Sequence, residues 1–162
     1  MCLLHVEPDM PTSKGQTLAH RDLTGLILKC FFDVYGELGH GFSELVLRRA
    51  MAIALEEAGL RVREEAALAV HFRGRCIGSF RADMIVEDTV LVEIKAATAL
   101  ENYAVSQILN YLKVAGGGVG LLLNFGRKPE FKRYVVGDPN VSLPRLNQSP
   151  HSSDRDLPEE PV

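Results

Sequence analysis

Three charged residues stand inside otherwise apolar stretches: Asp83 in "RADMIV", and Glu93 and Lys95 in "VLVEIKA". Side chains alternate across a strand, so Glu93 and Lys95 are expected on one face and Ile94 on the other. If the two stretches pair through the turn 87–89, Asp83 lies near-opposite Glu93, with Cβ atoms about 5 Å apart. Carboxylates that close raise one another's pKa, and a divalent cation removes the conflict. The pattern predicts a Mg²⁺ or Mn²⁺ site with Lys95 facing an anionic substrate.

An alternative interpretation of the Glu93 and Lys95 pair is an exposed ion pair on the wet face of a sheet. Such a pair contributes about 0–1 kcal/mol and has no chemical role. The E-x-K triplet alone favours this alternative, and Asp83 on the neighbouring stretch weakens it.

A helix after this stretch carries a second group of polar residues. Gln107 and Tyr111 are spaced i, i+4, and Tyr103 lies one turn earlier on the same stripe. We expect this stripe to face away from the core, where Gln107 can bind a phosphate and Tyr111 can brace a nucleotide. The alternative is a solvent-facing Gln and a half-buried Tyr.

Two further segments carry candidate residues. In "GHGFSEL", Glu44 enters the first turn of a helix, where a Glu is favoured by the helix dipole. In "HFRGRC", Arg73 and Arg75 form a basic turn suited to a backbone phosphate contact, unless the turn is an ordinary solvated hairpin.

The helices that position these residues follow from apolar spacing and breakers. Apolar residues between 23 and 38 recur at i, i+3, i+4 and i+7, which predicts an amphipathic helix with Asp22 as its N-cap. A second helix is expected from about 42 to 58, ending before Gly59. Thr98 and Glu101 form a T-x-x-E capping box that opens a third helix.

The strands are expected in five places. The stretches 60–74, 79–88 and 89–96 alternate well enough for three strands, the last two joined as a hairpin. The apolar stretch 119–125 is typical of a strand buried on both faces, and 131–136 adds an edge strand. The predicted fold is α/β (α+β), with a mixed central sheet flanked by helices.

Composition limits the class of protein. The 162 residues are 46% hydrophobic and 24% charged, which indicates one ordinary globular domain. We expect a flexible segment over 1–20, a folded domain over 21–137, and a disordered acidic tail rich in Pro and Ser over 138–162. Of the formal charge of −3, the two end segments carry −1 and −3, which leaves the folded part at +1.

Partners and location are constrained by absences in the sequence. No apolar run approaches the roughly 20 residues of a membrane span, and the N-terminus does not read as a signal peptide. Cys2, Cys30 and Cys76 are few and far apart, which predicts reduced thiols in the cytoplasm. A homodimer is possible and would enlarge the positive surface.

The order of these segments resembles the motif series of the PD-(D/E)XK nuclease superfamily, and its RecB-like branch most, because Gln-x-x-x-Tyr is characteristic of that branch. More narrowly, the sequence is similar to the small bacterial GxxExxY proteins. The matching segments are 23–25 ("LTG"), 37–41 ("ELGHG") and 120–126 ("GLLLNFG"). Leu47 stands where the GxxExxY proteins have their name-giving Tyr, and Ala82 where the superfamily has Pro.

The resemblance implies a restriction-endonuclease-like αβββαβ core and a divalent-metal-dependent phosphodiesterase. By position, Asp83 and Glu93 would bind the metal with the Ile94 carbonyl, and Glu44 would be an additional or water-mediated ligand. Lys95 would orient the attacking water or stabilise phosphoryl charge.

Further site roles are implied in the same way. Gln107 would support the site and bind phosphate. Tyr111, Arg81, Arg73 and Arg75 are the candidate substrate contacts.

Three functions remain open at this point. The first is a Mg²⁺- or Mn²⁺-dependent nuclease, a hydrolase acting on DNA. The second is a catalytically inactive nuclease fold that serves as an interaction subunit, favoured by the near-neutral charge of the folded part. The third is a hydrolase of a small phosphorylated molecule that uses the same site.

Overall fold

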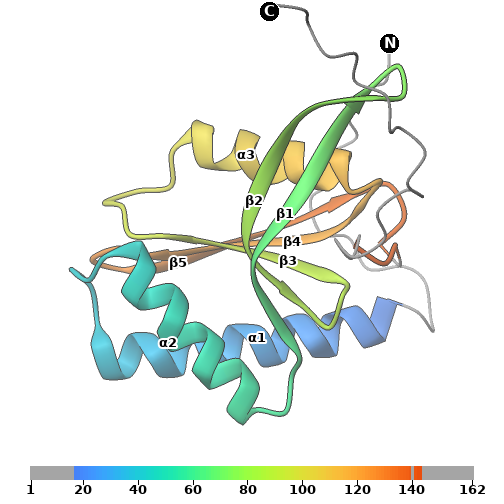
Figure 1. The fold of residues 1–162 in the computed structure, drawn as a ribbon. Helices are drawn as coiled ribbons and strands as arrows, with labels where there is room; N and C mark the ends of the chain where they lie inside the picture. Colours follow the sequence, from blue (N-terminus) through green and yellow to red (C-terminus); the bar gives the residue numbers. More distant parts are fainter. Residues whose placement is uncertain (1–16, 140, 144–162) are drawn as a thin grey trace, which may run out of the picture.

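The computed structural model describes residues 17–139 and 141–143 of the chain. The described part contains three helices and five strands (Figure 1). In chain order they are α1 (Thr17–Leu38), α2 (Glu44–Glu57), β1 (Val62–Phe72), β2 (Arg75–Val86), β3 (Val90–Lys95), α3 (Asn102–Val114), β4 (Gly118–Phe125) and β5 (Pro129–Val136).

The five strands form one mixed sheet in the order β1-β2-β3-β4-β5. Strands β3 and β4 are parallel, and every other neighbouring pair is antiparallel. Helix α3 makes the crossover between the parallel strands. Figure 1 shows α1 and α2 on one side of the sheet and α3 on the other. This is the predicted mixed sheet flanked by helices, consistent with a restriction-endonuclease-like fold.

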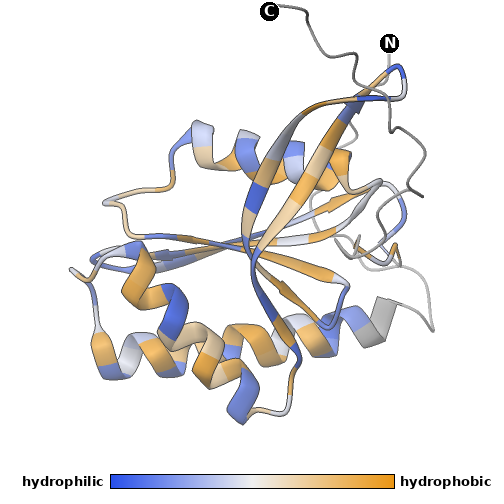
Figure 2. Ribbon diagram, in the orientation of Figure 1, coloured by the Kyte–Doolittle hydropathy of each residue, from blue (hydrophilic) through white to orange (hydrophobic). Residues whose placement is uncertain are grey.

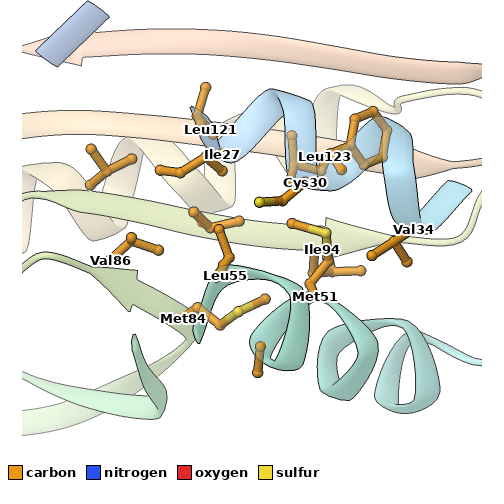
Figure 3. Packing of buried hydrophobic residues seen from close by; sticks show 14 of the residues in the cluster. Ile27, Cys30, Val34, Met51, Leu55, Met84, Val86, Ile94, Leu121 and Leu123 are labelled. Atoms are coloured by element: carbon orange, nitrogen blue, oxygen red, sulfur yellow. The ribbon is translucent and has the colours of Figure 1, made fainter. Parts of the chain in front are cut away.

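The core has two parts, one on each face of the sheet. Apolar residues of the helices face the sheet, and the central strands are hydrophobic along their length (Figure 2). Figure 3 shows side chains from α1 and α2 packed against strand residues. The cluster on that face includes Ile27, Phe31, Met51, Leu55, Met84, Val92, Ile94, Leu121 and Leu123. The cluster beneath α3 includes Ala82, Ile85, Leu91, Ile108, Tyr111, Leu112 and Leu122.

Alternation along β3 follows the prediction. Val92 and Ile94 belong to the cluster beneath α1 and α2, whereas Leu91 belongs to the cluster beneath α3. All eight residues of β4 are buried, which confirms a strand covered on both faces. The predicted edge strand is present as β5, and the second helix lies within its predicted range. Residues 87–89 form the turn of the predicted hairpin, where the Thr89 amide donates to the Val86 carbonyl at 3.1 Å.

Two predicted helix starts are wrong. Helix α1 begins at Thr17, so Asp22 lies inside it and is not its N-cap. The capping box of Thr98 and Glu101 does not form, because residues 98–100 belong to the connection and Glu101 is itself the extended N-cap residue. The Glu101 side chain makes no capping hydrogen bond.

The predicted terminal segments, 1–20 and 138–162, lie mostly outside the described residues. Within the first of them, residues 17–20 are helical. Within the second, Leu143 is buried in the cluster beneath α3, and its amide donates to the Asp88 carbonyl at 2.7 Å. The chain is therefore packed against the domain as far as Leu143.

Candidate metal and catalytic site

The candidate site lies where β2 and β3 separate. The ladder between them covers Met84–Val86 and Val90–Val92, so Asp83 and Glu93 are the next facing positions. There the side chains replace the ladder: the Ile94 amide donates to Asp83 Oδ2 at 2.7 Å, and the Asp83 amide lies 3.5 Å from Glu93 Oε2. The predicted proximity of the two carboxylates is confirmed.

Helix α3 accounts for the direction that β2 takes after the separation. The Tyr111 hydroxyl donates to the Arg81 carbonyl at 3.2 Å, and the Phe80 ring packs edge-on against the Tyr111 ring, with centroids 5.1 Å apart. On the other side of β2, Glu65 of β1 has a φ of 49°, an irregular conformation facing the same point. The two contacts of Tyr111 thus tie β2 to α3 beyond the point where β2 separates from β3.

Glu93 and Lys95 are not an exposed pair. The Glu93 side chain is 3% exposed and the Lys95 side chain 18%. Lys95 Nζ donates to Glu93 Oε1 at 3.2 Å. The alternative of an ion pair on the wet face of a sheet is therefore wrong. Removing a carboxylate from water costs several kcal/mol unless its surroundings compensate, so the buried Glu93 needs compensating partners.

The electrostatics of the site reflect burial and crowded carboxylates. Burial, followed by repulsion from Asp83, raises the pKa of Glu93 to about 7 despite the Lys95 ammonium. Burial also raises the pKa of Asp83, and the hydrogen bond from Ile94 offsets only part of that rise. For Lys95, burial acts to lower the pKa, but attraction to Glu93 and Glu44 outweighs it and the pKa is raised. Lys95 therefore keeps its charge at neutral pH.

The predicted polar stripe on α3 is only partly exposed. Tyr111 is 4% exposed and belongs to the core, so the expectation that its face points away from the core is wrong. Gln107 Nε2 donates to the Tyr111 hydroxyl at 2.7 Å. The buried phenol thus links Gln107 to the backbone of β2. Tyr103 is 76% exposed near the start of the helix.

Glu44 is the first residue of α2 and is exposed. The helix is capped by Ser43, whose hydroxyl accepts from the Val46 amide at 3.4 Å. The Glu44 side chain lines a pocket of about 240 Å³ together with Lys95 and the start of α3. Its charge contributes to the raised pKa of both Asp83 and Lys95.

Sequence reasoning missed Arg48. Its guanidinium lies 3.7 Å from Asp83 Oδ1, 3.3 Å from Glu65 Oε1 and 3.6 Å from Glu64 Oε2. The side chain is largely buried. The available signal was its position one helical turn after Glu44, which places both residues on the same face of α2.

The donor set suits a hard divalent cation, although the carboxylates are not gathered around one point. Within residues 17–139 and 141–143, no three His, Cys, Asp or Glu side chains are close enough together to hold a metal ion. The nearest approach is the pair Asp83 and Glu93. Their oxygens, the Ile94 carbonyl and the Glu44 carboxylate are the ligand types that Mg²⁺ and Mn²⁺ prefer. Burial is the main cause of the raised pKa of both carboxyl groups, and a cation bound between them would stabilise their charged forms.

The predicted arginine contacts lie in different places. Arg81 is exposed on β2, with NH1 3.7 Å from Glu65 Oε1. Arg73 and Arg75 flank the turn of the long β1–β2 hairpin, whose tip projects away from the body of the sheet (Figure 1). Arg75 is eight positions from Asp83 along β2, which is roughly 26 Å in an extended strand. The structure does not bring the hairpin tip to the carboxylates.

A family model agrees with this arrangement. The model of the PD-(D/E)XK nuclease superfamily matches residues 21–134, which is more than half of the chain. This chain belongs to the PD-(D/E)XK nuclease superfamily. Ala82, which precedes Asp83, is fully buried beneath α3.

Other comparisons add little. The search of curated proteins found no match. Among solved structures, one described as "Crystal structure of SSO0001" aligns with a TM-score of 0.45 and 15% identity over 73% of this chain. This chain spans 60% of the length of that protein. No helix in the described ranges is both long enough and apolar enough to cross a membrane.

Proposed function

We propose that this superfamily member is a divalent-metal-dependent nuclease that hydrolyses phosphodiester bonds in DNA. The observation that carries the proposal is the buried carboxylate of Glu93, with its pKa raised to about 7, beside Asp83 and a charged Lys95. Strongly perturbed ionisable groups with a specific charge partner cluster at functional sites, and Lys95 of this group lines a pocket. Membership of a nuclease superfamily supplies the substrate class.

Within the superfamily, we assign the chain to the bacterial GxxExxY proteins of the RecB-like branch. The three matching segments support this assignment, and so does the contact of Gln107 with Tyr111 in the Gln-x-x-x-Tyr motif. Leu47, which replaces the name-giving Tyr, is fully buried against α1 and the sheet. The position thus serves packing here, and its change removes no proposed ligand. The free thiols of Cys30 and Cys76 fit the cytoplasm.

Asp83, Glu93 and the Ile94 carbonyl are the proposed metal ligands, with Glu44 as an additional or water-mediated one. Bound there, Mg²⁺ or Mn²⁺ supplies Lewis-acid activation of the phosphoryl group and of the attacking water. The exposed position of Glu44 on the first turn of α2 leaves its side chain free to adjust toward a ligand in the adjacent pocket.

Lys95 is the proposed electrostatic catalyst. Its ammonium borders the pocket and stays protonated, so it stabilises the negative charge that develops on the phosphoryl oxygens. Glu93 fixes its position through the 3.2 Å contact. Gln107 is held by Tyr111, and its remaining amide proton and carbonyl are the proposed contacts to a phosphate or a water. Tyr111 therefore acts by positioning, and Arg81 is the exposed candidate contact beside it.

One observation favours a second function, an inactive nuclease fold that serves as an interaction subunit. Arg48 already provides a counter-charge to Asp83 without a metal, at 3.7 Å. In that case Asp83, Glu93 and Arg48 would form a purely structural network. Calorimetry with Mn²⁺ distinguishes the two, because the subunit would bind no metal.

Cleavage of labelled DNA with Mg²⁺, and its loss in EDTA, tests the nuclease proposal. We expect Lys95→Ala and Glu93→Ala to abolish cutting while far-UV circular dichroism stays unchanged. Lys113→Ala, an exposed lysine in the last turn of α3, is the matched control and should cut normally. Full activity in the double variant Asp83→Ala, Glu93→Ala would refute the proposal. Light scattering of the same samples reports whether a homodimer forms.

A further inference from the structure

The chain that follows Lys95 is fastened to the end of β4 by one buried side chain. Asn124 is fully buried and pairs with Lys95 in the parallel ladder. Its side chain bonds both backbone groups of Ala97: Oδ1 accepts from the amide at 2.9 Å, and Nδ2 donates to the carbonyl at 3.0 Å. The side-chain amide of Asn124 thus continues the hydrogen bonding between β3 and β4 after β3 has ended.

The turn after β4 is fixed against the same segment. A Cβ added to Gly126 would collide with the Ala97 carbonyl oxygen, so the close approach requires glycine there. From the other side, the Tyr35 hydroxyl of α1 shares its proton between the carbonyls of Gly126 and Arg127, each at 2.9 Å. These contacts hold the β4–β5 turn at a set position relative to Lys95.

This rigid turn and the first half of β5 present basic side chains. Arg127, Lys128 and Lys132 are exposed, with Glu130 as the acidic residue among them. We refer to Arg127, Lys128 and Lys132 as the basic turn. No carboxylate in the described part of the chain forms an ion pair with any of these three residues, whereas Arg48, Arg61 and Arg81 all have acidic partners. A rigid backbone that carries unneutralised cations is suited to binding a polyanion.

Two adjacent hollows lie between the candidate site and the start of β5, where Lys132 is the basic residue that lines one of them. The pocket of about 240 Å³ beside Lys95 includes Ala99 and Leu100 of the connection before α3. The same two residues line a shallower hollow of about 540 Å³ whose other wall is β5, with Glu130 and Lys132 as its charged residues. Figure 1 shows the β4–β5 turn, the connection between β3 and α3, and the start of α2 at the same end of the molecule.

We propose that the basic turn binds the sugar-phosphate backbone of the substrate strand next to the bond that is cut. The inference rests on the nuclease proposal and specifies how its substrate is held. Exposed Tyr103, which lines the pocket beside Lys95, is suited to stack on a base of a single strand. The proposal places the main phosphate contact at the basic turn. The hairpin tip with Arg73 and Arg75 projects away from the body of the sheet and is not the main contact.

Oligonucleotide binding without metal tests the inference independently of cutting. Fluorescence anisotropy in EDTA is measured over a salt series with single-stranded and duplex DNA. For Arg127→Gln, Lys128→Gln, the salt slope should fall by about 1.5 and the affinity at about 0.1 M salt by about 30-fold, the effect of two lost phosphate contacts. The matched pair Lys29→Gln, Lys113→Gln, exposed on α1 and α3, should bind like the wild type.

Each outcome bears on the inference. Unchanged binding in the basic-turn variant, equal loss in the matched pair, or a larger loss in Arg73→Gln, Arg75→Gln would overturn it. If the wild type binds through the basic turn but never cuts, the nuclease proposal fails and only the DNA contact of the basic turn stands. If the wild type cuts and the basic-turn variant keeps the wild-type KM, the inference fails alone. The inference is supported if the basic-turn variant has a higher KM than the wild type and the same kcat.

Discussion

Glu93 should destabilise the metal-free protein above neutral pH, and Glu93→Gln should remove that cost. Glu93 has a pKa of about 7 in the folded protein against 4.5 ordinarily. Below pH 4.5 the group is protonated in both the folded and unfolded states. As the pH rises toward 7, the unfolded chain loses the proton first, so the free energy of unfolding falls.

The size of the effect follows from the difference between the two pKa values. A difference of about 2.5 corresponds to about 3 kcal/mol at 1.36 kcal/mol for each pKa unit. Little discount for solvent screening applies, because the Glu93 side chain is 3% exposed. Glutamine keeps the shape of the protonated acid and can still accept from Lys95. In EDTA, Glu93→Gln should therefore raise the free energy of unfolding by about 3 kcal/mol near pH 8 and by about 1 kcal/mol near pH 5.

Urea unfolding followed by circular dichroism at several pH values measures this difference. Glu57→Gln, at the exposed last residue of α2, is the control and should change stability little at any pH. A Glu93→Gln protein no more stable than the wild type near pH 8, or a gain that does not shrink in acid, would refute the reasoning about burial and repulsion.

Three further predictions concern other contacts. Tyr111→Phe should cost about 1 kcal/mol of unfolding free energy, measured by urea unfolding, and lower cleavage by releasing Gln107; a wild-type rate would contradict its positioning role. Gly126→Ala should cost about 1–3 kcal/mol because its Cβ meets the Ala97 carbonyl oxygen, and an unchanged melting temperature would contradict this. Mn²⁺ at about 100 times its Kd should stabilise the wild type by about 3 kcal/mol and leave Asp83→Asn unaffected; equal melting shifts in both proteins would exclude Asp83 as a ligand.

Local rules were sufficient to predict the strands around the site. Alternation placed Glu93 and Lys95 on one face of the strand, and a short turn set Asp83 beside Glu93, because the register of a hairpin is fixed by its loop. The fully apolar stretch of β4 marked a strand between two helical layers. These features depend on neighbours along the chain, which a sequence displays directly.

The features that sequence reasoning missed depend on long-range contacts. Tyr111 was expected away from the core because it shares a stripe with Gln107, yet its ring packs on Phe80 of a distant strand. Arg48 reaches Asp83 only through the packing of α2 against β1 and β2. The predicted capping box does not form because residues 98–100 belong to the connection before α3. Ala99 and Leu100 of that connection line the pocket beside Lys95.

The central claim is that Asp83 and Glu93 share a divalent cation beside Lys95. A crystal structure of the protein soaked in Mn²⁺, with anomalous scattering measured, tests it most directly. The account predicts one strong anomalous peak in contact with carboxylate oxygens of both Asp83 and Glu93. A fully soaked crystal with no peak there, and with Arg48 still beside Asp83, would contradict the claim.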